Sequence, residues 1–465
     1  MLFNSINFFV FLPAVLLVLA VTPRSWRNPV LLVASYVFYG SWDWRFLALL
    51  FVTTCIDYWV GHKIHTASDR DVQRRFLWIS LSANLVVLGF FKYFNFFIES
   101  AADLLDVAGL SVSMPTLRII LPVGVSFYTF QSMSYVIDVY RRDAPPASNF
   151  LDYALYVAYF PQLVAGPISR VSDLLTQLQA PARVTAERVN VGLMLILLGL
   201  VKKVLIADMV ALEVDRIFSN ASEMSSGMLL RGAYLFAFQI YGDFSGYSDM
   251  ARGVSELFGV RLIINFQQPY LSQSITEFWR RWHISLSSWL RDYLYIPLGG
   301  NRNGPLMTYR NLILTMLIGG LWHGANWTFV AWGGWHGMFL AGERLLGIGS
   351  EKAARARGFV PRVLLTLVTF HIAVFGWIFF RAPSVAVAFD YFAGIFAFTD
   401  LAAIGLTPLI VAAAILVIDI PQDRWGDHVT FLRLPWWVQS PVYATACFAM
   451  LLYGGREIPF IYFQF

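Results

Sequence analysis

Most apolar positions of this chain fall in long runs, and polar positions gather between them. A helix crosses the hydrocarbon core of a bilayer with about 20 apolar residues. The clearest runs cover residues 5–22, 45–60, 76–97, 189–210, 312–330, 363–380, 407–420 and 435–453. Some are short or interrupted, as in tilted, re-entrant or interfacial helices. The pattern predicts an all-α, polytopic integral membrane protein with about ten to eleven transmembrane helices.

The middle of the chain, from about residue 121 to residue 337, breaks this regularity. Glycine, proline and polar residues interrupt its apolar stretches, for example at Pro122, Gly124, Pro161 and Gly166. In a membrane, non-helical backbone is tolerated only where protein buries it or where it lines a cavity. We therefore expect a single membrane domain over residues 1–465, with its functional centre in residues 121–337.

Composition agrees with a membrane protein. The 465 residues are 58% hydrophobic and only 14% charged, whereas soluble proteins carry roughly 25% charged residues. A soluble protein so poor in charge would not cover its surface with polar groups, and lipid is the solvent that accepts the excess.

The placement of charge predicts an orientation in the membrane. Basic residues gather at Arg24 and Arg27, at residues 63–75, at Arg141 and Arg142, and at residues 344–362. The positive-inside rule places these loops in the cytoplasm and the acidic segment 99–106 outside. Counting helices between these markers puts both termini outside. The basic residues lie at helix ends that face lipid head groups and form no continuous stripe, so we expect lipid contacts and no nucleic-acid partner.

His323 is the first candidate for chemistry. It lies in the sequence GGLWHGANW, residues 319–327, inside an apolar run. An ionisable residue within a membrane span is costly and is a functional hypothesis by default. Imidazole titrates near neutrality and can take a proton from an attacking hydroxyl or thiol. The alternative is a histidine that only bonds a neighbouring carbonyl.

His283 is the second candidate, in the sequence EFWRRWHISLS of residues 277–287. If residues 277–295 form one helix, Trp282, Leu286, Trp289 and Tyr293 share one face. The neighbouring arginines can pair with phosphates near the cytoplasmic interface. We expect the donor to be bound by Arg280, Arg281, Trp282 and Arg291. The alternative is an interfacial anchor helix, which explains the arginines and tryptophans equally well.

Other ionisable residues receive supporting or structural interpretations. Asp243 and Asp249 could orient a histidine, but ion pairs are the favoured interpretation, with Lys202 and Lys203 as possible partners. His336 is assigned at most a supporting role. The sequence places the remaining histidines in charged surface loops or in packing: His62, His65 and His428 in loops, and His371 in packing.

The sequence lacks the motifs that are typical of several classes of protein. The chain has no phosphate-cradling glycine loop, no Gly-x-Ser-x-Gly elbow and no His-Glu-x-x-His helix. We therefore expect no ATP-driven pump, no ordinary serine esterase, no bound metal and no permanently bound cofactor. A transporter or channel in which histidines and aspartates relay protons stays open as an alternative.

Two long motifs resemble the membrane-bound O-acyltransferase superfamily. They are residues 278–283 followed by Arg-Asp-Tyr at 291–293, and Trp-His-Gly at 322–324. Phe-Asn-Ser at 3–5 and the segment 241–249 are similar to the bacterial branch. Members of that branch acetylate exported polysaccharides such as alginate or transfer D-alanyl groups to teichoic acid. The resemblance runs over essentially the whole chain.

The resemblance implies a fold and a set of roles. Helices would surround a central funnel in the bacterial inner membrane, with His323 as the invariant catalytic histidine and His283 as the second. The donor would be a cytoplasmic acyl thioester such as acetyl-CoA, and the acceptor an exported polysaccharide. A periplasmic esterase-like O-acetyltransferase partner would complete the transfer. D-alanyl transfer is the alternative within the superfamily.

The C-terminal tail, residues 456–465, adds a third candidate. Its last residues, FIYFQF, resemble the terminal Phe-x-Tyr-x-x-Phe motif of a small peptide partner in D-alanylation. By that resemblance Tyr462 would relay the acyl group. The predicted outside location of this end agrees with such a role. The alternative is a greasy tail that packs on the last helix.

Overall fold

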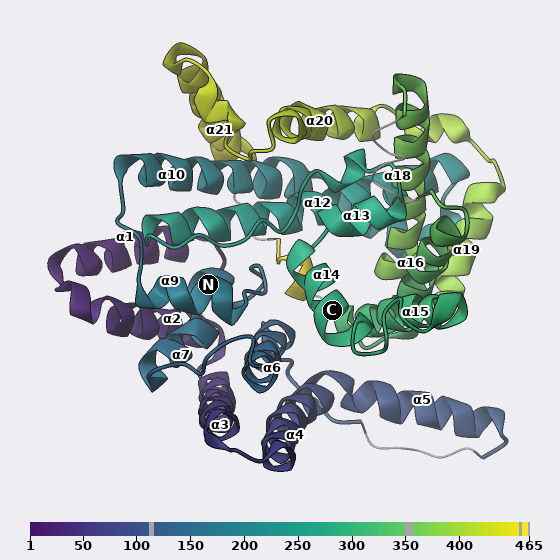
Figure 1. Ribbon diagram of the computed structural model, residues 1–465. Coiled ribbons are helices and arrows are strands. Elements are labelled where there is room, and N and C mark those ends of the chain that lie inside the picture. Colours follow the sequence, from purple (N-terminus) through teal and green to yellow (C-terminus); the bar gives the residue numbers. More distant parts are fainter. Residues whose placement is uncertain (111–115, 349–356, 455–457, 464–465) are drawn as a thin grey trace. The chain divides into compact units, whose positions relative to one another are not determined.

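The computed structural model describes residues 1–110, 116–348, 357–454 and 458–463, and these residues form helices and no strands (Figure 1). The chain divides into two compact units. The first comprises Met1–Gly192 with Val254–Ile263, and the second comprises Leu193–Gly253 with Ile264–Phe465. Helices α10 (Ala186–Leu200) and α12 (Ser226–Leu257) contribute residues to both.

The first unit holds the N-terminal helices. Its α-helices are α1 (Ile6–Val21), α2 (Arg27–Asp43), α3 (Arg45–Thr66), α4 (Arg70–Leu88), α5 (Phe94–Val107), α6 (Val125–Arg141), α7 (Phe150–Ala158), α8 (Phe160–Leu163) and α9 (Thr176–Gln179). Shorter helical segments are η1 (Arg24–Trp26), η2 (Gly89–Tyr93) and η3 (Val171–Leu175).

The second unit holds the remaining helices, among them both predicted catalytic histidines. Its α-helices are α11 (Asp208–Ser219), α13 (Ile275–Arg281), α14 (Ile284–Leu290), α15 (Gly304–His323), α16 (Trp327–Leu345), α18 (Phe359–Arg381), α19 (Val385–Phe396), α20 (Thr407–Trp425) and α21 (Trp436–Tyr453). Shorter segments are η4 (Val201–Ala207), η5 (Ala221–Glu223), η6 (Pro269–Leu271), η7 (Arg291–Tyr295), η8 (Leu401–Ile404), η9 (Thr430–Arg433) and η10 (Ile461–Phe463).

The membrane interpretation is supported by the length and composition of these helices. Among the described residues, three continuous helical stretches are long and apolar enough to cross a bilayer: Arg70–Val107, Ala186–Ser219 and Phe359–Arg381. The helices Ile6–Val21 and Val385–Phe396 are apolar but shorter. The all-helical membrane architecture is therefore confirmed, while a total of ten to eleven spans stays a prediction.

One predicted span is wrong. The run 312–330 is divided between α15 and α16, which form a helical hairpin in the second unit (Figure 1). Gly324 adopts an extended conformation after α15, and Asn326 caps α16 by accepting a hydrogen bond from the Thr328 backbone N. A Cβ on Gly320 would lie 2.1 Å from the Phe329 carbonyl oxygen, so this glycine lets the two helices pack closely.

The first unit has a polar contact deep in its core. The side chain of Asp57 on α3 is fully buried, and it accepts hydrogen bonds from Ser80 Oγ at 2.5 Å and from Asn84 Nδ2 at 3.0 Å. Both donors belong to α4, which packs along α3. Buried polar groups are stable where they are paired in this way, so the contact fixes the α3–α4 pair.

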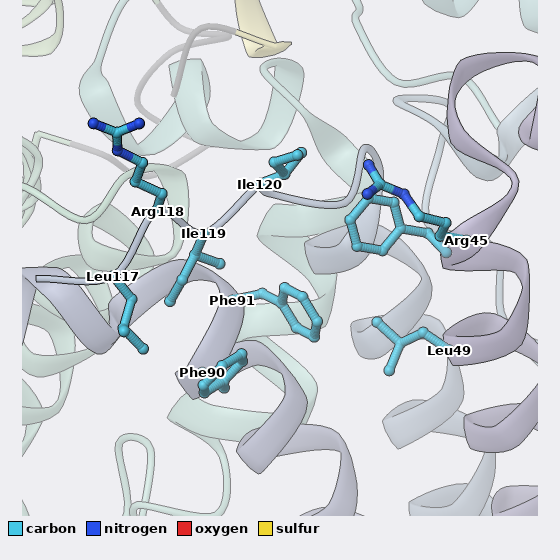
Figure 2. Close-up of a pocket in the computed structure, with 9 residues that line it drawn as sticks. Arg45, Leu49, Phe90, Phe91, Leu117, Arg118, Ile119 and Ile120 are labelled. Carbon is cyan, nitrogen blue, oxygen red and sulfur yellow. The ribbon is translucent and has the colours of Figure 1, made fainter.

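A pocket of about 520 Å³ opens in the first unit (Figure 2). Aromatic and aliphatic side chains from α3, η2 and the segment after α5 form its walls, and two arginines flank it: Arg45, Phe46, Leu49, Phe90, Phe91, Leu117, Arg118, Ile119 and Ile120. Arg45 is paired with Asp43 at 2.5 Å. None of the candidate site residues lines this pocket.

Candidate active site

His323 is the last residue of α15 and is almost completely buried, with 4% of its surface exposed. Aromatic rings from α15, α16 and α18 enclose it. Its ring centroid lies 5.0 Å from that of Trp322, 4.9 Å from Trp332 and 5.4 Å from Phe380. The flanking Gly324 is required by packing, because a Cβ there would lie 2.0 Å from the ring of Phe329. This enclosure excludes water from the imidazole.

His283 occupies a break between two short helices. Residues 277–295 were expected to form one helix, and this is wrong: α13 ends at Arg281, and α14 begins at Ile284. His283 has φ 43°, in the left-handed region, and its Nδ1 accepts a hydrogen bond from the Leu286 backbone N at 3.4 Å. A left-handed backbone at a residue other than glycine is strained and is concentrated at functional sites.

Asn265 is the polar neighbour of His283, and sequence reasoning did not find it. Its Oδ1 lies 3.2 Å from His283 Nδ1 and accepts a hydrogen bond from Ser285 Oγ at 2.9 Å. The two contacts of Nδ1 belong to different tautomers: with the proton on Nε2, Nδ1 accepts from the Leu286 backbone N, and with the proton on Nδ1 it donates to Asn265 Oδ1 and the Nε2 lone pair is left for chemistry. Burial lowers the pKa of the His283 imidazole, which favours its neutral form.

The two histidines meet, which their sequence separation did not show. The centroids of the His283 and His323 rings lie 6.4 Å apart. Trp322 contacts both, at 6.2 Å from His283 and 5.0 Å from His323. Two imidazoles from separate helical segments therefore share one apolar enclosure in the second unit.

Tyr462 joins them. Its ring lies in η10, with its centroid 5.8 Å from that of His323 and 6.3 Å from that of Phe380. Phe244 of α12 links the tyrosine to His283, at centroid distances of 4.3 Å and 4.7 Å. The three predicted catalytic residues thus converge on one cluster of rings.

The rest of the tail is only partly described. Phe460 is buried and its ring lies 5.0 Å from Tyr247 and 5.6 Å from Tyr462. Residues 456–457 and 464–465 of the predicted tail lie outside the described residues, as do residues 349–356 of the last basic cluster. The described part packs against α12 and the histidine cluster.

The residues expected to bind the donor are spread over different surroundings. Arg280 is exposed. Arg281 forms ion pairs with Glu277 at 2.7 Å and Asp423 at 2.6 Å, and Arg291 pairs with Asp292 at 2.6 Å. Trp282 is fully buried and stacks on Phe278, so packing accounts for it here. Binding of a donor by these residues stays a prediction.

The buried aspartates form ion pairs, as the sequence favoured. Asp243 pairs with Lys203 and Asp249 with Lys202, each at 2.7 Å. His428 was placed on the surface, and this is wrong. It is 5% exposed, and its Nδ1 lies 3.1 Å from Asp249 Oδ1, because the loop after α20 folds back onto α12.

His336 lies close to the cluster but in purely aromatic surroundings. It is fully buried, stacks on Phe278 at 6.0 Å and contacts Trp332 at 5.0 Å. Within the described part of the chain neither ring nitrogen has a hydrogen-bond partner. Its predicted supporting role is therefore limited to packing behind Trp332, which itself contacts His323.

The arrangement is suited to acyl transfer to oxygen. A neutral imidazole can take the proton of an attacking hydroxyl, and a dry aromatic enclosure protects a reactive ester from water. No group of acidic, histidine and cysteine side chains able to hold a metal occurs among the described residues.

Comparisons with known proteins identify the family. A model of the membrane-bound O-acyltransferase family matches residues 42–381. The probable alginate O-acetylase AlgI of Pseudomonas aeruginosa is 40% identical, and the alignment covers 100% of both chains. The peptidoglycan O-acetyltransferase of Helicobacter pylori is 38% identical over 85% of this chain and 79% of its own length.

A more distant relative is the teichoic acid D-alanyltransferase of Streptococcus thermophilus, 30% identical over 47% of this chain and 55% of that protein. The family model extends over both the region of His283 and that of His323. The resemblance seen in the sequence motifs is therefore confirmed. The chain belongs to the membrane-bound O-acyltransferase family, and it is an integral membrane enzyme that transfers acyl groups to oxygen.

Proposed function

We propose that this enzyme transfers acetyl groups from a cytoplasmic thioester across the bacterial inner membrane, for O-acetylation of an exported polysaccharide. The observation that carries the proposal is the cluster of His283, His323 and Tyr462, in which two imidazoles and one phenol share an enclosure of aromatic rings. Relatives named for acetyl transfer align with most or all of the chain, whereas those named for D-alanyl transfer align with about half. Alginate or a similar cell-surface polymer is the proposed acceptor.

In the first step His323 acts as general base. Its imidazole takes the phenolic proton of Tyr462 as the phenolate oxygen attacks the carbonyl carbon of the acetyl thioester. The C–S bond breaks, the leaving thiolate takes the proton from the imidazolium, and free thiol departs. The acetyl group is then an ester on Tyr462. His283, oriented by Asn265, supports the carbonyl or the departing group.

In the second step the ester passes its acetyl group outward. A phenol with pKa near 10 is a better leaving group than a sugar hydroxyl, so an aryl ester retains transfer potential. A hydroxyl of the next acceptor attacks the ester carbonyl, and Tyr462 recovers its proton. We propose a periplasmic esterase-like protein as that acceptor or as the catalyst of the last transfer to the polymer.

The donor is proposed to be acetyl-CoA or another acyl thioester, used as a substrate and not held as a cofactor. Arg280, Arg281 and Arg291 would meet its phosphates on the cytoplasmic side, since guanidinium groups bind phosphate bidentately. The present ion pairs of Arg281 with Glu277 and Asp423, and of Arg291 with Asp292, would have to be exchanged for the donor phosphates.

The test uses purified protein in detergent with radiolabelled acetyl-CoA. The enzyme should release free CoA, and mass spectrometry of the tail peptide should find one acetyl group on Tyr462. The Tyr462→Phe variant should lose the label and the tail ester together. Release of no CoA, as expected for a transporter or channel, would reject the proposal. Labelling from a D-alanyl thioester but not from acetyl-CoA would reject the acetyl assignment alone.

A further inference from the structure

Three buried charged side chains lie next to the tail in the second unit. Lys203 belongs to η4, Asp208 begins α11, and Asp243 lies on α12. They are 4%, 5% and 2% exposed, respectively. Lys203 Nζ lies 2.7 Å from a carboxylate oxygen of each aspartate. Burying charges is costly unless every group is paired and hydrogen-bonded.

The tail backbone completes this group. The Ile461 backbone N–H donates to Asp243 Oδ2 at 2.6 Å, and Lys203 Nζ donates to the Ile458 carbonyl oxygen at 3.2 Å. An ammonium group has three N–H donors, and Asp208, Asp243 and Ile458 account for all three. Of the two Asp243 oxygens, one faces Lys203 and the other accepts from the tail.

Glycines explain how these charges come together. A Cβ on Gly199 would lie 2.4 Å from the Gly246 carbonyl oxygen, and one on Gly246 would lie 2.7 Å from the Gly199 carbonyl oxygen. A Cβ on Gly242 would lie 2.9 Å from the Lys202 carbonyl oxygen. The α10–η4 stretch and α12 therefore touch backbone to backbone, which brings Lys203 to Asp243.

A neighbouring ion pair shows what is special about this group. Lys202 and Asp249 bridge the same two helical stretches at 2.7 Å, but Asp249 is completed by Arg252 at 3.0 Å and His428 at 3.1 Å. Side chains of the helical body thus satisfy Asp249. Asp243 and Lys203 instead each form one hydrogen bond with the tail backbone: Asp243 accepts from the Ile461 N–H, and Lys203 donates to the Ile458 carbonyl oxygen.

We propose that Lys203, Asp208 and Asp243 form a docking clamp that binds the tail by its backbone and thereby positions Tyr462 against His323. The clamp grips residues 458 and 461, and the next residue along is Tyr462, whose ring rests on Phe244, the neighbour of Asp243. The three clamp residues are positioning residues and take no part in bond making. Docking itself is independent of the proposed function, and only the role of the docked tyrosine rests on it.

The clamp binds main-chain groups, so it recognises the backbone of the tail and does not depend on which side chains stand at residues 458 and 461. Removal of the Ile461 N–H is therefore the sharpest perturbation. Ile461→Pro deletes that donor, and proline is well tolerated at the first position of a helical turn, where Ile461 stands in η10. Ile461→Val keeps the N–H and has a side chain of similar size, so it is the matched control.

The experiment measures docking directly. Purified full-length protein in detergent is exposed to carboxypeptidase, and intact-mass spectrometry follows the loss of the residues after Tyr462 with time, because carboxypeptidases cleave the Pro–Tyr bond of the Ile461→Pro variant poorly. A charge-assisted hydrogen bond contributes enough that Ile461→Pro should be trimmed roughly tenfold faster or more, and Asp243→Asn should behave alike. Ile461→Val should be trimmed at the wild-type rate, and Asp249→Asn should not accelerate trimming. Equal trimming of Ile461→Pro and Ile461→Val, or of Asp243→Asn and Asp249→Asn, would overturn the clamp.

A kinetic readout separates positioning from general loosening. Ile461→Pro should lower kcat for acetyl transfer to the tail while leaving the apparent KM for acetyl-CoA unchanged, because the donor side of the site is untouched. A raised donor KM would argue against a positioning role. If trimming responds as expected but wild-type protein never acetylates Tyr462, the clamp stands and the proposed function fails. If Tyr462 is acetylated but trimming is insensitive to Ile461→Pro, the proposed function stands and the clamp fails.

Discussion

At the scale of single residues, the proposed chemistry depends on side chains at the ends of helices. His323 closes α15 and His283 precedes α14, so neither is held inside a regular helix. The rarity of ionisable residues in apolar runs selected His323 from the sequence, whereas His283 was selected because an interfacial anchor helix explains its arginine and tryptophan neighbours better than it explains the histidine. Their contact, at 6.4 Å between ring centroids, was not predictable because it depends on how the α13–α14 segment packs against α15.

The first prediction concerns His323. His323→Ala should reduce CoA release from acetyl-CoA by about 10²–10⁴-fold, the usual cost of removing a general base. His371→Gln is the control, because His371 bonds Tyr234 and the Leu367 carbonyl oxygen and should tolerate the change. The assay measures thiol release by purified protein, and size-exclusion chromatography checks that each variant is folded. Near-normal release by a folded His323→Ala enzyme would exclude it as the base.

The second prediction concerns Asn265. If it orients His283, Asn265→Ala should lower kcat by about one to two orders of magnitude, in the lower part of the range for acid–base groups. Asn265→Asp should recover part of the loss, because a carboxylate oxygen can still accept from Nδ1–H. The measurement is kcat against pH for both variants. Equal rates in all three proteins would make Asn265 a packing residue only.

The third prediction concerns the arginines near His283. If they bind donor phosphates, Arg280→Gln should raise the apparent KM for acetyl-CoA several-fold and leave kcat close to wild type. A short acetyl thioester without phosphates, such as acetyl-pantetheine, should show no such difference between variant and wild type. An unchanged KM for acetyl-CoA would assign Arg280 to lipid head groups.

At the scale of elements, glycines decide which helices touch. Gly199 and Gly246 join α10 to α12, and Gly320 allows α15 to pack on α16. The sequence pattern predicted helices over these stretches but merged α15 with α16, because an apolar run does not show a reversal within it. It also missed the break at His283, since a left-handed φ is uncommon at residues other than glycine.

The fourth prediction tests the α10–α12 contact. Gly246→Ala places a Cβ 2.7 Å from the Gly199 carbonyl oxygen, so it should destabilise the protein by about 1–3 kcal/mol, as overpacking does. Gly342→Ala in α16 is the matched control, because no atom lies within 4 Å of its Cβ. Heating in detergent followed by fluorescence size exclusion gives both melting temperatures. Equal melting temperatures would contradict the close contact.

At the scale of the whole molecule, apolar runs and composition predicted an all-helical membrane protein, and the motifs around His283 and His323 predicted its family. The structure and the family match confirm both. The apolar stretches alone do not determine the number of spans or the orientation, which stay predictions. In the described part of the chain three helical stretches are long and apolar enough to cross a bilayer, and helices that pack inside a protein can carry polar residues that lower their mean hydropathy.

The fifth prediction tests orientation. Basic loops place the segment 63–75 inside and both termini outside. The test uses spheroplasts that express a variant in which Cys55 and Cys447 are replaced and Ser68→Cys is introduced. The new thiol should not react with a membrane-impermeant maleimide until the cells are lysed. A cleavable tag at the C-terminus should be removed by added protease without lysis. Labelling of Ser68→Cys in intact spheroplasts, or a protected tag, would reverse the assigned orientation.

The tail that carries Tyr462 belongs to the same polypeptide as His323, and this has a consequence for stoichiometry. A tethered segment meets its site at an effective concentration in the millimolar range for a short linker. Each enzyme molecule would therefore carry its own proposed acceptor, Tyr462, without a second gene product, and dilution of the protein would not empty the site. A peptide of the same sequence supplied in solution would have to reach millimolar levels before it displaced the resident segment.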